Sequence, residues 1–239
     1  MLHKVRLMTS IWHLLGPFIG AVGMLWSSYV QAQIAPSAAE IAQYTGMHAA
    51  AQRGDVAQIQ RLGTTATAVN ATDIYGRTPL HVAAFAKQRD AIRALVKAGA
   101  DLSKLENDRY DAVTIASVAD DEETLRVLLQ LGASAKLTTS RWDGTALIAA
   151  AHLGHDGVVR QLIQGGAPLD HVNNLHWTAA IEAVVLGNGG ARHQATLKAL
   201  IDAGANLKLT DRDGHTPLQL ARTRGFSEMV SMLEKADKK

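Results

Sequence analysis

From residue 41 onward, short apolar stretches with helical spacing alternate with polar stretches that contain glycine, asparagine and aspartate. In the clearest example, the residues that share the apolar faces of two consecutive helices are Leu80, Ala83, Ala84, Ile92, Leu95 and Val96. Thr78 is suited to cap the first helix, with Pro79 in its first turn, and Gly99 is suited to end the second. The pattern therefore predicts pairs of short helices joined by turns such as the one at 73–76.

The predicted helix pair recurs at a nearly constant interval. The helix-start position is occupied by Thr45, Thr78, Asp111, Thr145, Thr178 and Thr216, at intervals of 33, 33, 34, 33 and 38 residues. A Gly-Ala dipeptide follows the start by 21 residues in three units, and by 26 residues in the unit that carries an insertion around 186–190. One such unit cannot bury both of its apolar faces alone, so the units are expected to stack into a solenoid.

Two segments carry a family resemblance. Residues 78–84 read TPLHVAA and residues 211–218 read DRDGHTPL, and both are similar to the motif of ankyrin repeats. The resemblance implies a mainly α fold, an ankyrin-repeat solenoid of stacked helix–turn–helix units with short β-turn fingers. It also implies that the His48 and His81 rings hydrogen-bond to turn backbone.

The resemblance covers residues 41–239, which we divide into six units after a linker at 33–40. The expected units are 41–71, 72–104, 105–137, 138–170, 171–208 and 209–239, with the first and last as caps. The unit at 105–137 has lost the motif and is expected to be locally weak. The unit at 171–208 is expected to carry an extra loop between its helices.

Residues 1–32 have the layout of a secretory signal peptide. Lys4 and Arg6 precede an apolar run at 11–26, and small residues lead up to an expected cleavage after Ala32. We therefore expect an exported protein of the bacterial periplasmic type, periplasmic or secreted. Since 11–30 is long enough to cross a bilayer, an uncleaved inner-membrane anchor facing the periplasm is the alternative.

Composition excludes several classes of protein. The chain has no cysteine, which removes disulfide frameworks, thiolate metal sites and cysteine nucleophiles. Only 5% of the residues are aromatic against 47% hydrophobic, a balance that suits helix packing better than β-sandwich cores. Lys4 and Arg6 are the only charged residues in 1–32, so the remainder has 22 basic and 22 acidic residues. This balance argues against nucleic acid as a partner.

The candidate chemical motifs have simpler structural interpretations. His152 and His155 could form half of a metal site, but their spacing matches the turn between repeat helices. The glycines at 187–190 lack the spacing and the lysine of a phosphate loop, and the acidic run at 120–123 is suited to the start of a helix. We expect no catalytic residue, metal or cofactor, and therefore no enzyme.

The candidate binding surface lies on the fingers and the first helices. Successive fingers carry Tyr75, Tyr110, Trp142 and Trp177, and equivalent positions of the first helices carry Phe85, Val118, His152 and Val185. The other finger residues expected on this face are Arg77, Asp108, Arg141, Leu175, Arg212 and His215. The rings could instead pack on adjacent fingers. Aromatic anchors with a polar rim favour a protein partner.

We therefore interpret the chain as a protein–protein interaction module that binds an envelope partner through its finger tips and concave face. The alternative is an inhibitor or immunity protein that blocks a secreted toxin or hydrolase. The sequence does not name the partner. A membrane contact is expected only through an uncleaved N-terminal segment.

Overall fold

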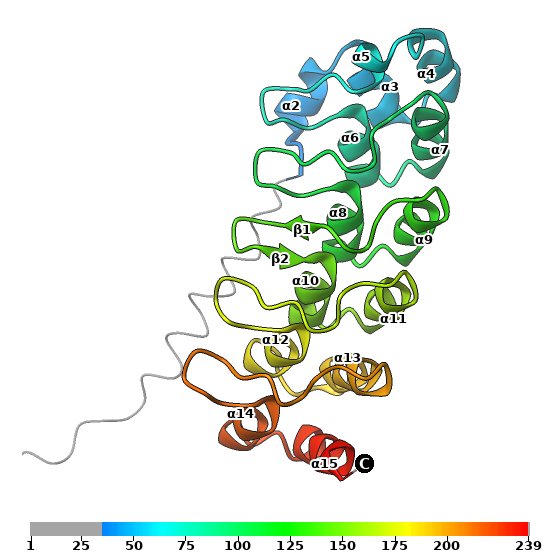
Figure 1. Ribbon diagram of the computed structural model, residues 1–239. Coiled ribbons are helices and arrows are strands. Elements are labelled where there is room, and N and C mark those ends of the chain that lie inside the picture. Colours follow the sequence, from blue (N-terminus) through cyan, green and yellow to red (C-terminus); the bar gives the residue numbers. More distant parts are fainter. Residues whose placement is uncertain (1–34, 239) are drawn as a thin grey trace, which may run out of the picture.

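The structure, a computed structural model, describes residues 35–238, so the expected signal peptide and its cleavage site lie outside the described residues. The chain forms an elongated stack of helix pairs, with the fingers projecting to one side (Figure 1). The pairs are α3 (Gly46–Arg53) with α4 (Val56–Leu62), α6 (Pro79–Phe85) with α7 (Arg89–Lys97), α8 (Ala112–Val118) with α9 (Glu122–Gln130), α10 (Ala146–Leu153) with α11 (Asp156–Gln164), α12 (Ala179–Val185) with α13 (Ala191–Asp202), and α14 (Pro217–Thr223) with α15 (Ser227–Asp237). Each pair falls within one of the expected units, which makes the architecture the predicted mainly α solenoid.

Two short helices flank the first pair. Helix α2 (Ala38–Gln43) begins inside the segment expected to be a linker, because Ser37 caps it and shares a reciprocal capping box with Glu40. Helix α5 (Ala66–Val69) follows α4. The chain therefore becomes helical a few residues earlier than the repeat pattern indicated.

The starts of the first helices explain why the repeat motif recurs. The side chains of Thr78, Thr145, Thr178 and Thr216 each accept a hydrogen bond from the backbone N–H three residues later. In the unit that has lost the motif, Asp111 does the same for the N–H of Thr114 at 2.8 Å. The local weakness expected there is not visible in the geometry, since α8 is capped like its neighbours.

The insertion in the fifth unit is divided between a loop and a helix. The connection between α12 and α13 has five residues, 186–190, against three between α6 and α7. Helix α13 has twelve residues, three more than α7. The extra loop that we expected therefore accounts for two inserted residues, and the other three lengthen α13.

The fingers share one turn that the sequence pattern did not reveal. In each of five fingers, one side chain accepts hydrogen bonds from the backbone N–H groups of the residues two and four positions later. The acceptor is a carboxylate, an amide oxygen or a hydroxyl. The accepting residues are Asp73, Glu106, Ser140, Asn173 and Asp211. In the finger of Ser140 the strands β1 (Thr138–Thr139) and β2 (Gly144–Thr145) pair antiparallel.

Backbone hydrogen bonds join successive fingers into a ladder. The N–H of Asn107 donates to the carbonyl of Tyr75, and the N–H of Asn174 donates to the carbonyl of Trp142, both at 3.0 Å. Two histidine rings add further links, from His48 Nε2 to the Arg77 carbonyl at 2.9 Å and from His81 Nε2 to the Lys104 carbonyl at 3.0 Å. These rings contact turn backbone, as the family resemblance implied.

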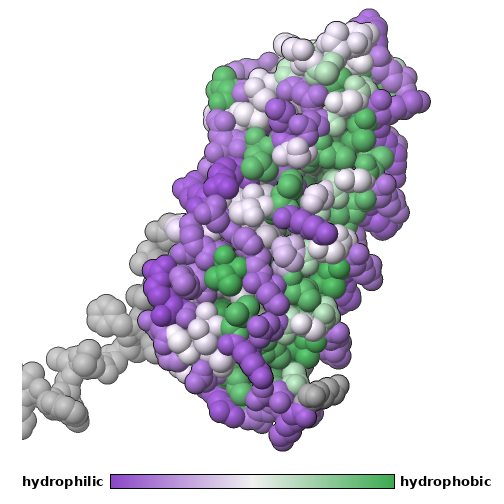
Figure 2. Space-filling model, in the orientation of Figure 1, coloured by the Kyte–Doolittle hydropathy of each residue, from purple (hydrophilic) through white to green (hydrophobic). Residues whose placement is uncertain are grey.

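The core runs through the whole stack because helices pack on their counterparts in the next unit. Fully buried leucine and isoleucine side chains fill the centre, and buried alanines allow the first helices to approach closely. Figure 2 shows a hydrophobic band along the stack, flanked by hydrophilic surface on the finger edge and on the opposite edge. Within residues 35–238, no helix has the length and apolar character needed to cross a membrane.

Candidate functional site

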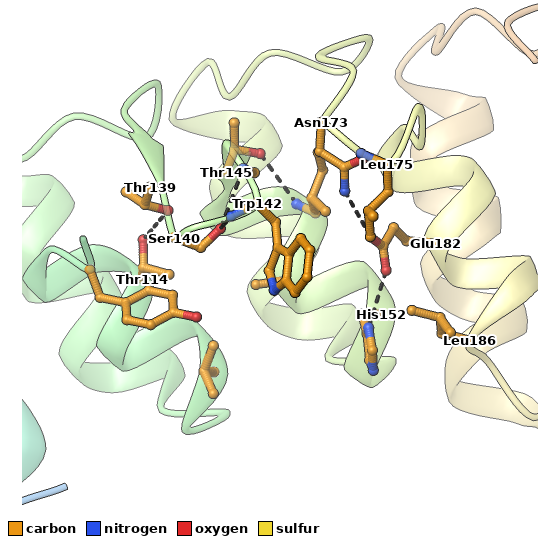
Figure 3. Close-up of a pocket in the computed structure, with 15 residues that line it drawn as sticks. Thr114, Thr139, Ser140, Trp142, Thr145, His152, Asn173, Leu175, Glu182 and Leu186 are labelled. Carbon is orange, nitrogen blue, oxygen red and sulfur yellow. Dashed lines mark hydrogen bonds and ion pairs between the residues drawn. The ribbon is translucent and has the colours of Figure 1, made fainter. Parts of the chain in front are cut away.

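A pocket of about 310 Å³ opens between the fingers and the first helices of the third, fourth and fifth units. The fingers contribute Trp142 and Leu175, and the first helices contribute His152 from α10 and Glu182 from α12 (Figure 3). Tyr110, at the end of the third finger just before α8, closes the side toward the third unit. We call the surface formed by the fingers and the first helices the inner face.

A chain of hydrogen bonds forms the polar wall of the pocket. Asn173 Nδ2 donates to Glu182 Oε1 at 3.0 Å, and His152 Nδ1 lies 3.1 Å from Glu182 Oε2. The ring N–H must be the donor in the second contact, because a carboxylate only accepts. Asn173 is itself fixed by the finger turn, since its Oδ1 accepts from the N–H groups of Leu175 and Trp177 at 3.0 Å. The fold of the fifth finger thus determines where the Glu182 carboxylate lies.

The remaining walls are mainly apolar. Ile148, Leu186 and Val118 line them together with the Trp142 ring. The pocket is wide at this point because Ala149 takes a position that larger apolar residues occupy in other first helices.

Tyr110 has a side chain that is 7% exposed, and burial raises the pKa of its phenol above the usual value. A raised pKa keeps the phenol protonated at neutral pH. The ring therefore presents a neutral wall to the pocket.

Sequence reasoning missed Glu182, although a signal was available. Glu182 is only 4% exposed, and it occupies the repeat position that holds Val82, Ile115, Ala149 and Leu220 in other units. A carboxylate at a buried, otherwise apolar position requires specific hydrogen-bond partners. One of them, Asn173, belongs to a finger and could be recognised only after the finger turn was known.

The structure brings together five of the residues predicted for partner binding, and leaves the others elsewhere. Tyr110, Trp142, His152 and Leu175 line the pocket together with Val118. The remaining predicted residues do not line it: Tyr75, Arg77, Phe85, Asp108, Arg141, Trp177, Val185, Arg212 and His215. Among these, Tyr75 is 43% exposed in the second unit, while Phe85, Trp177 and Val185 are half-buried.

The prediction for Arg77 needs correction. Its side chain is 3% exposed, because the guanidinium pairs with Asp73 at 2.8 Å and with Glu40 of α2 at 2.7 Å. Hydrogen bonds from Ser37, together with the bond from Arg77, lower the pKa of Glu40 to about 2. Arg77 therefore fixes α2 to the second unit. Its guanidinium carbon lies 4.4 Å from the centre of the Tyr75 ring. It is not available to a partner.

The other polar finger residues mostly join neighbouring fingers. Arg141 pairs with Asp108 at 2.9 Å, and Arg109 pairs with Asp143 at 2.8 Å, so the third and fourth fingers exchange reciprocal ion pairs. Arg212 donates to the Asn174 carbonyl at 3.0 Å. The three arginines are exposed, and each has an intramolecular partner that a ligand would have to replace.

The histidines that could suggest a metal site are separated by their contacts. His155 Nδ1 bonds to the Ser117 carbonyl at 2.9 Å, whereas His152 contacts Glu182. Among residues 35–238, the one cluster of three ligand-type groups is formed by Asp211, Asp213 and His215 in the last finger. The Asp211 carboxylate in that cluster already accepts two backbone N–H groups of the turn.

Three residues of the acidic run at 120–123 have the capping role that we expected, whereas Asp120 pairs with Arg192 at 2.9 Å. The side chain of Asp121 accepts from the backbone N–H of Thr124 and caps α9. Glu122 and Glu123 occupy the first turn of that helix, where carboxylates favour the positive end of the helix dipole.

Comparisons with known proteins agree with the fold. A family model described as ankyrin repeats (3 copies) matches residues 27–106 and 112–204. The protein YahD of Escherichia coli (strain K12) is 34% identical over 185 residues, which are 77% of this chain and 92% of that protein.

Solved structures give the same result. An ankyrin repeat domain from Acinetobacter baumannii AYE superposes with a TM-score of 0.75 at 42% identity, covering 80% of this chain and 97% of the other. The ankyrin repeat domain of Bcl-3, a member of the IkappaB protein family, gives 0.70 at 27% identity, covering 81% and 86% of the two chains.

Proposed function

Because the chain belongs to the ankyrin-repeat family, a family of non-enzymatic modules for protein–protein interaction, we propose that its inner face binds a protein partner at the pocket of Trp142 and Glu182. The observation that carries this proposal is the convergence of Tyr110, Trp142, His152 and Leu175 from three successive units on one pocket. The proposal includes the export of this protein and the location of its partner in the cell envelope.

The character of the pocket supports a macromolecular partner. Aromatic rings in a partly desolvated pocket, surrounded by a polar rim, are the usual centre of a protein interface. Around this pocket, Arg141 and Asn174 provide exposed polar groups on the fingers, and the partly exposed Asp108 pairs with Arg141. The inner face also continues along the stack on either side, so that a partner could contact several units at once.

Site-specific photocrosslinking tests the proposal. A photoreactive phenylalanine analogue at Trp142 should give a discrete crosslinked product in the native cells, because this side chain lies at the centre of the proposed interface. The matched control carries the same analogue at Arg126, an exposed residue of α9, and this helix lies on the side of the stack away from the fingers (Figure 1). Crosslinking at both positions alike, or at Arg126 alone, would contradict the proposal.

The crosslinked product also allows the effect of binding on the partner to be measured. If mass spectrometry identifies the crosslinked partner as a toxin or hydrolase, its activity should be measured with and without this chain. Loss of activity in the presence of the wild-type chain, but not of the Trp142→Ala variant, would assign the chain as an inhibitor. Unchanged activity of the partner would indicate that the chain binds it without inhibiting it.

Export rests on residues 1–32 alone, and a direct measurement tests it. N-terminal sequencing of the protein purified from the extracytoplasmic fraction should begin at Gln33, because cleavage is expected after Ala32. Intact Met1 in the membrane fraction would indicate an anchor instead. Intact Met1 in the cytoplasm would refute export.

A further inference from the structure

The pocket holds a carboxylate with little positive charge around it. Its lining contains Glu182 and His152 but no lysine or arginine. In the described part of the chain, the ion pair of Glu182 is with His152, whose ring is charged only when protonated. No permanently charged basic side chain among the residues that line the pocket therefore compensates this carboxylate.

The Glu182 carboxylate has unused capacity to accept hydrogen bonds. A carboxylate offers about four acceptor positions, and Asn173 and His152 occupy one each. Asn173 approaches the carboxylate from the fifth finger and His152 approaches it from α10, and Glu182 lines the same pocket as the Trp142 ring (Figure 3). A donor that enters the pocket can therefore reach the carboxylate without displacing either bond.

The aromatic and apolar walls of the pocket suit a positive charge on an aliphatic stem. Trp142 and Tyr110 present aromatic surface, and a cation over an aromatic face is attracted by the ring quadrupole. Ile148 and Leu186 provide apolar contacts for methylene groups. Long basic side chains combine these two properties, since their stems pack on apolar surface while the head remains polar.

We propose that the pocket receives one lysine or arginine side chain of the protein partner, with its cationic head on Glu182 and its stem against Trp142. This inference rests on the proposed function and adds the chemistry of the residue recognised. A purely apolar side chain would bury the carboxylate further without compensating its charge. An acidic side chain would be repelled by it.

Small probes test this charge preference without knowledge of the partner. The full chain is titrated with N-acetyl-L-arginine methylamide, N-acetyl-L-lysine methylamide and the uncharged N-acetyl-L-norleucine methylamide. Binding is followed through the NMR signal of the Trp142 indole N–H, assigned with Trp142→Phe. The dissociation constants of the basic probes should be at least tenfold lower than that of the norleucine probe.

The substitution Glu182→Gln supplies the specific control, because it removes the charge and leaves an oxygen for the Asn173 bond. It should raise the dissociation constants of the basic probes to that of the norleucine probe. The matched variant Glu123→Gln, at an exposed carboxylate on α9 that pairs with Arg126, should leave all three constants unchanged.

Two results would overturn the inference. One is equal or tighter binding of the norleucine probe to the wild-type chain, a comparison that does not depend on any variant folding. The other is an unchanged preference for basic probes in a folded Glu182→Gln variant. Partner crosslinking at Trp142 with no charge preference among the probes would refute this inference alone. A charge preference without any crosslinked partner would refute the proposed function and leave a pocket for small basic molecules.

Discussion

At the scale of single residues, different side chains perform the same task in successive units. Asp73, Glu106, Ser140 and Asn173 all accept the two N–H groups that close a finger turn. The requirement at this position is an acceptor oxygen at the correct reach, not a particular residue type. A sequence motif that names one residue type at each position therefore misses this recurring hydrogen-bonding role in the finger turn.

The histidine of the TPLH motif makes folding sensitive to mild acid. Burial lowers the pKa of His81 from 6.5 to about 4, and the neutral ring accepts from the Thr78 N–H and donates to the Lys104 carbonyl. The unfolded chain takes up this proton near pH 6.5, whereas the folded chain resists until about pH 4. The free energy of unfolding should therefore fall as the pH drops across this window, by up to about 3 kcal/mol from this residue.

Urea denaturation at a series of pH values measures this effect. His81→Gln should be less stable than the wild type at pH 7 but should lose less stability between pH 6.5 and 4. The exposed residue His176 provides the control, and His176→Gln should keep the wild-type slope. An unchanged slope in His81→Gln would contradict the assignment.

Asp111 offers a stabilising substitution. It caps α8 from a position that is 1% exposed, where burial raises the pKa of its carboxyl. A charged carboxylate is therefore held there at a cost in free energy at neutral pH. Asp111→Thr restores the motif residue and keeps the cap, and should raise the free energy of unfolding at pH 7 by about 1 kcal/mol. Thermal unfolding checks this, and a lower melting temperature would contradict it.

At the scale of elements, the ends of the helices determine how tightly successive units approach. Gly154 ends α10 with φ of 70°, and a Cβ atom there would lie 2.8 Å from the His193 ring. That ring reaches across from α13 to donate through Nε2 to the His152 carbonyl at 2.9 Å. The glycine therefore provides both the left-handed conformation and the space for the next unit.

Two glycine substitutions separate these contributions. Gly99→Ala introduces a Cβ atom at φ of 95° with nothing within 4 Å. It should lower the free energy of unfolding only by the cost of the left-handed backbone conformation, about 1 kcal/mol. Gly154→Ala should cost about 1–3 kcal/mol more, because the His193 ring must move. Chemical denaturation of both variants gives the difference. Equal losses would show that the ring adapts freely.

At the scale of the whole molecule, each unit contacts its neighbours in the stack, so stability is distributed along one dimension. Leu147 lies fully buried in α10, near the middle, while Leu233 is 1% exposed in the terminal helix α15. Equivalent truncations at the two positions should therefore have different consequences.

Hydrogen exchange followed by mass spectrometry tests this expectation. Leu147→Ala should lower the free energy of unfolding by about 2–5 kcal/mol and increase exchange in units on both sides. Leu233→Ala should increase exchange mainly in α14 and α15. Uniform exchange along the chain in both variants would indicate one all-or-none unit instead.

The helix pairs and their approximate ends were largely predictable from the sequence. The helix pairs followed from the apolar spacing and from the Thr and Gly positions at their ends, because these features act within a few residues. The division of the insertion between a loop and α13 was not predictable, since it depends on how far α13 must extend along α11 and α15. The aromatic positions indicated the inner face but not the pocket.

The amino-acid pattern alone specifies a stack of helix pairs, because a fixed repeat of amphipathic faces can be buried only between neighbouring units. The packing of the folded chain sets which side chains meet. It buried Arg77 between Asp73 and Glu40, and it placed Glu182 opposite Trp142 although they are 40 residues apart. Such contacts arise between units, where residue spacing within one repeat specifies no partner.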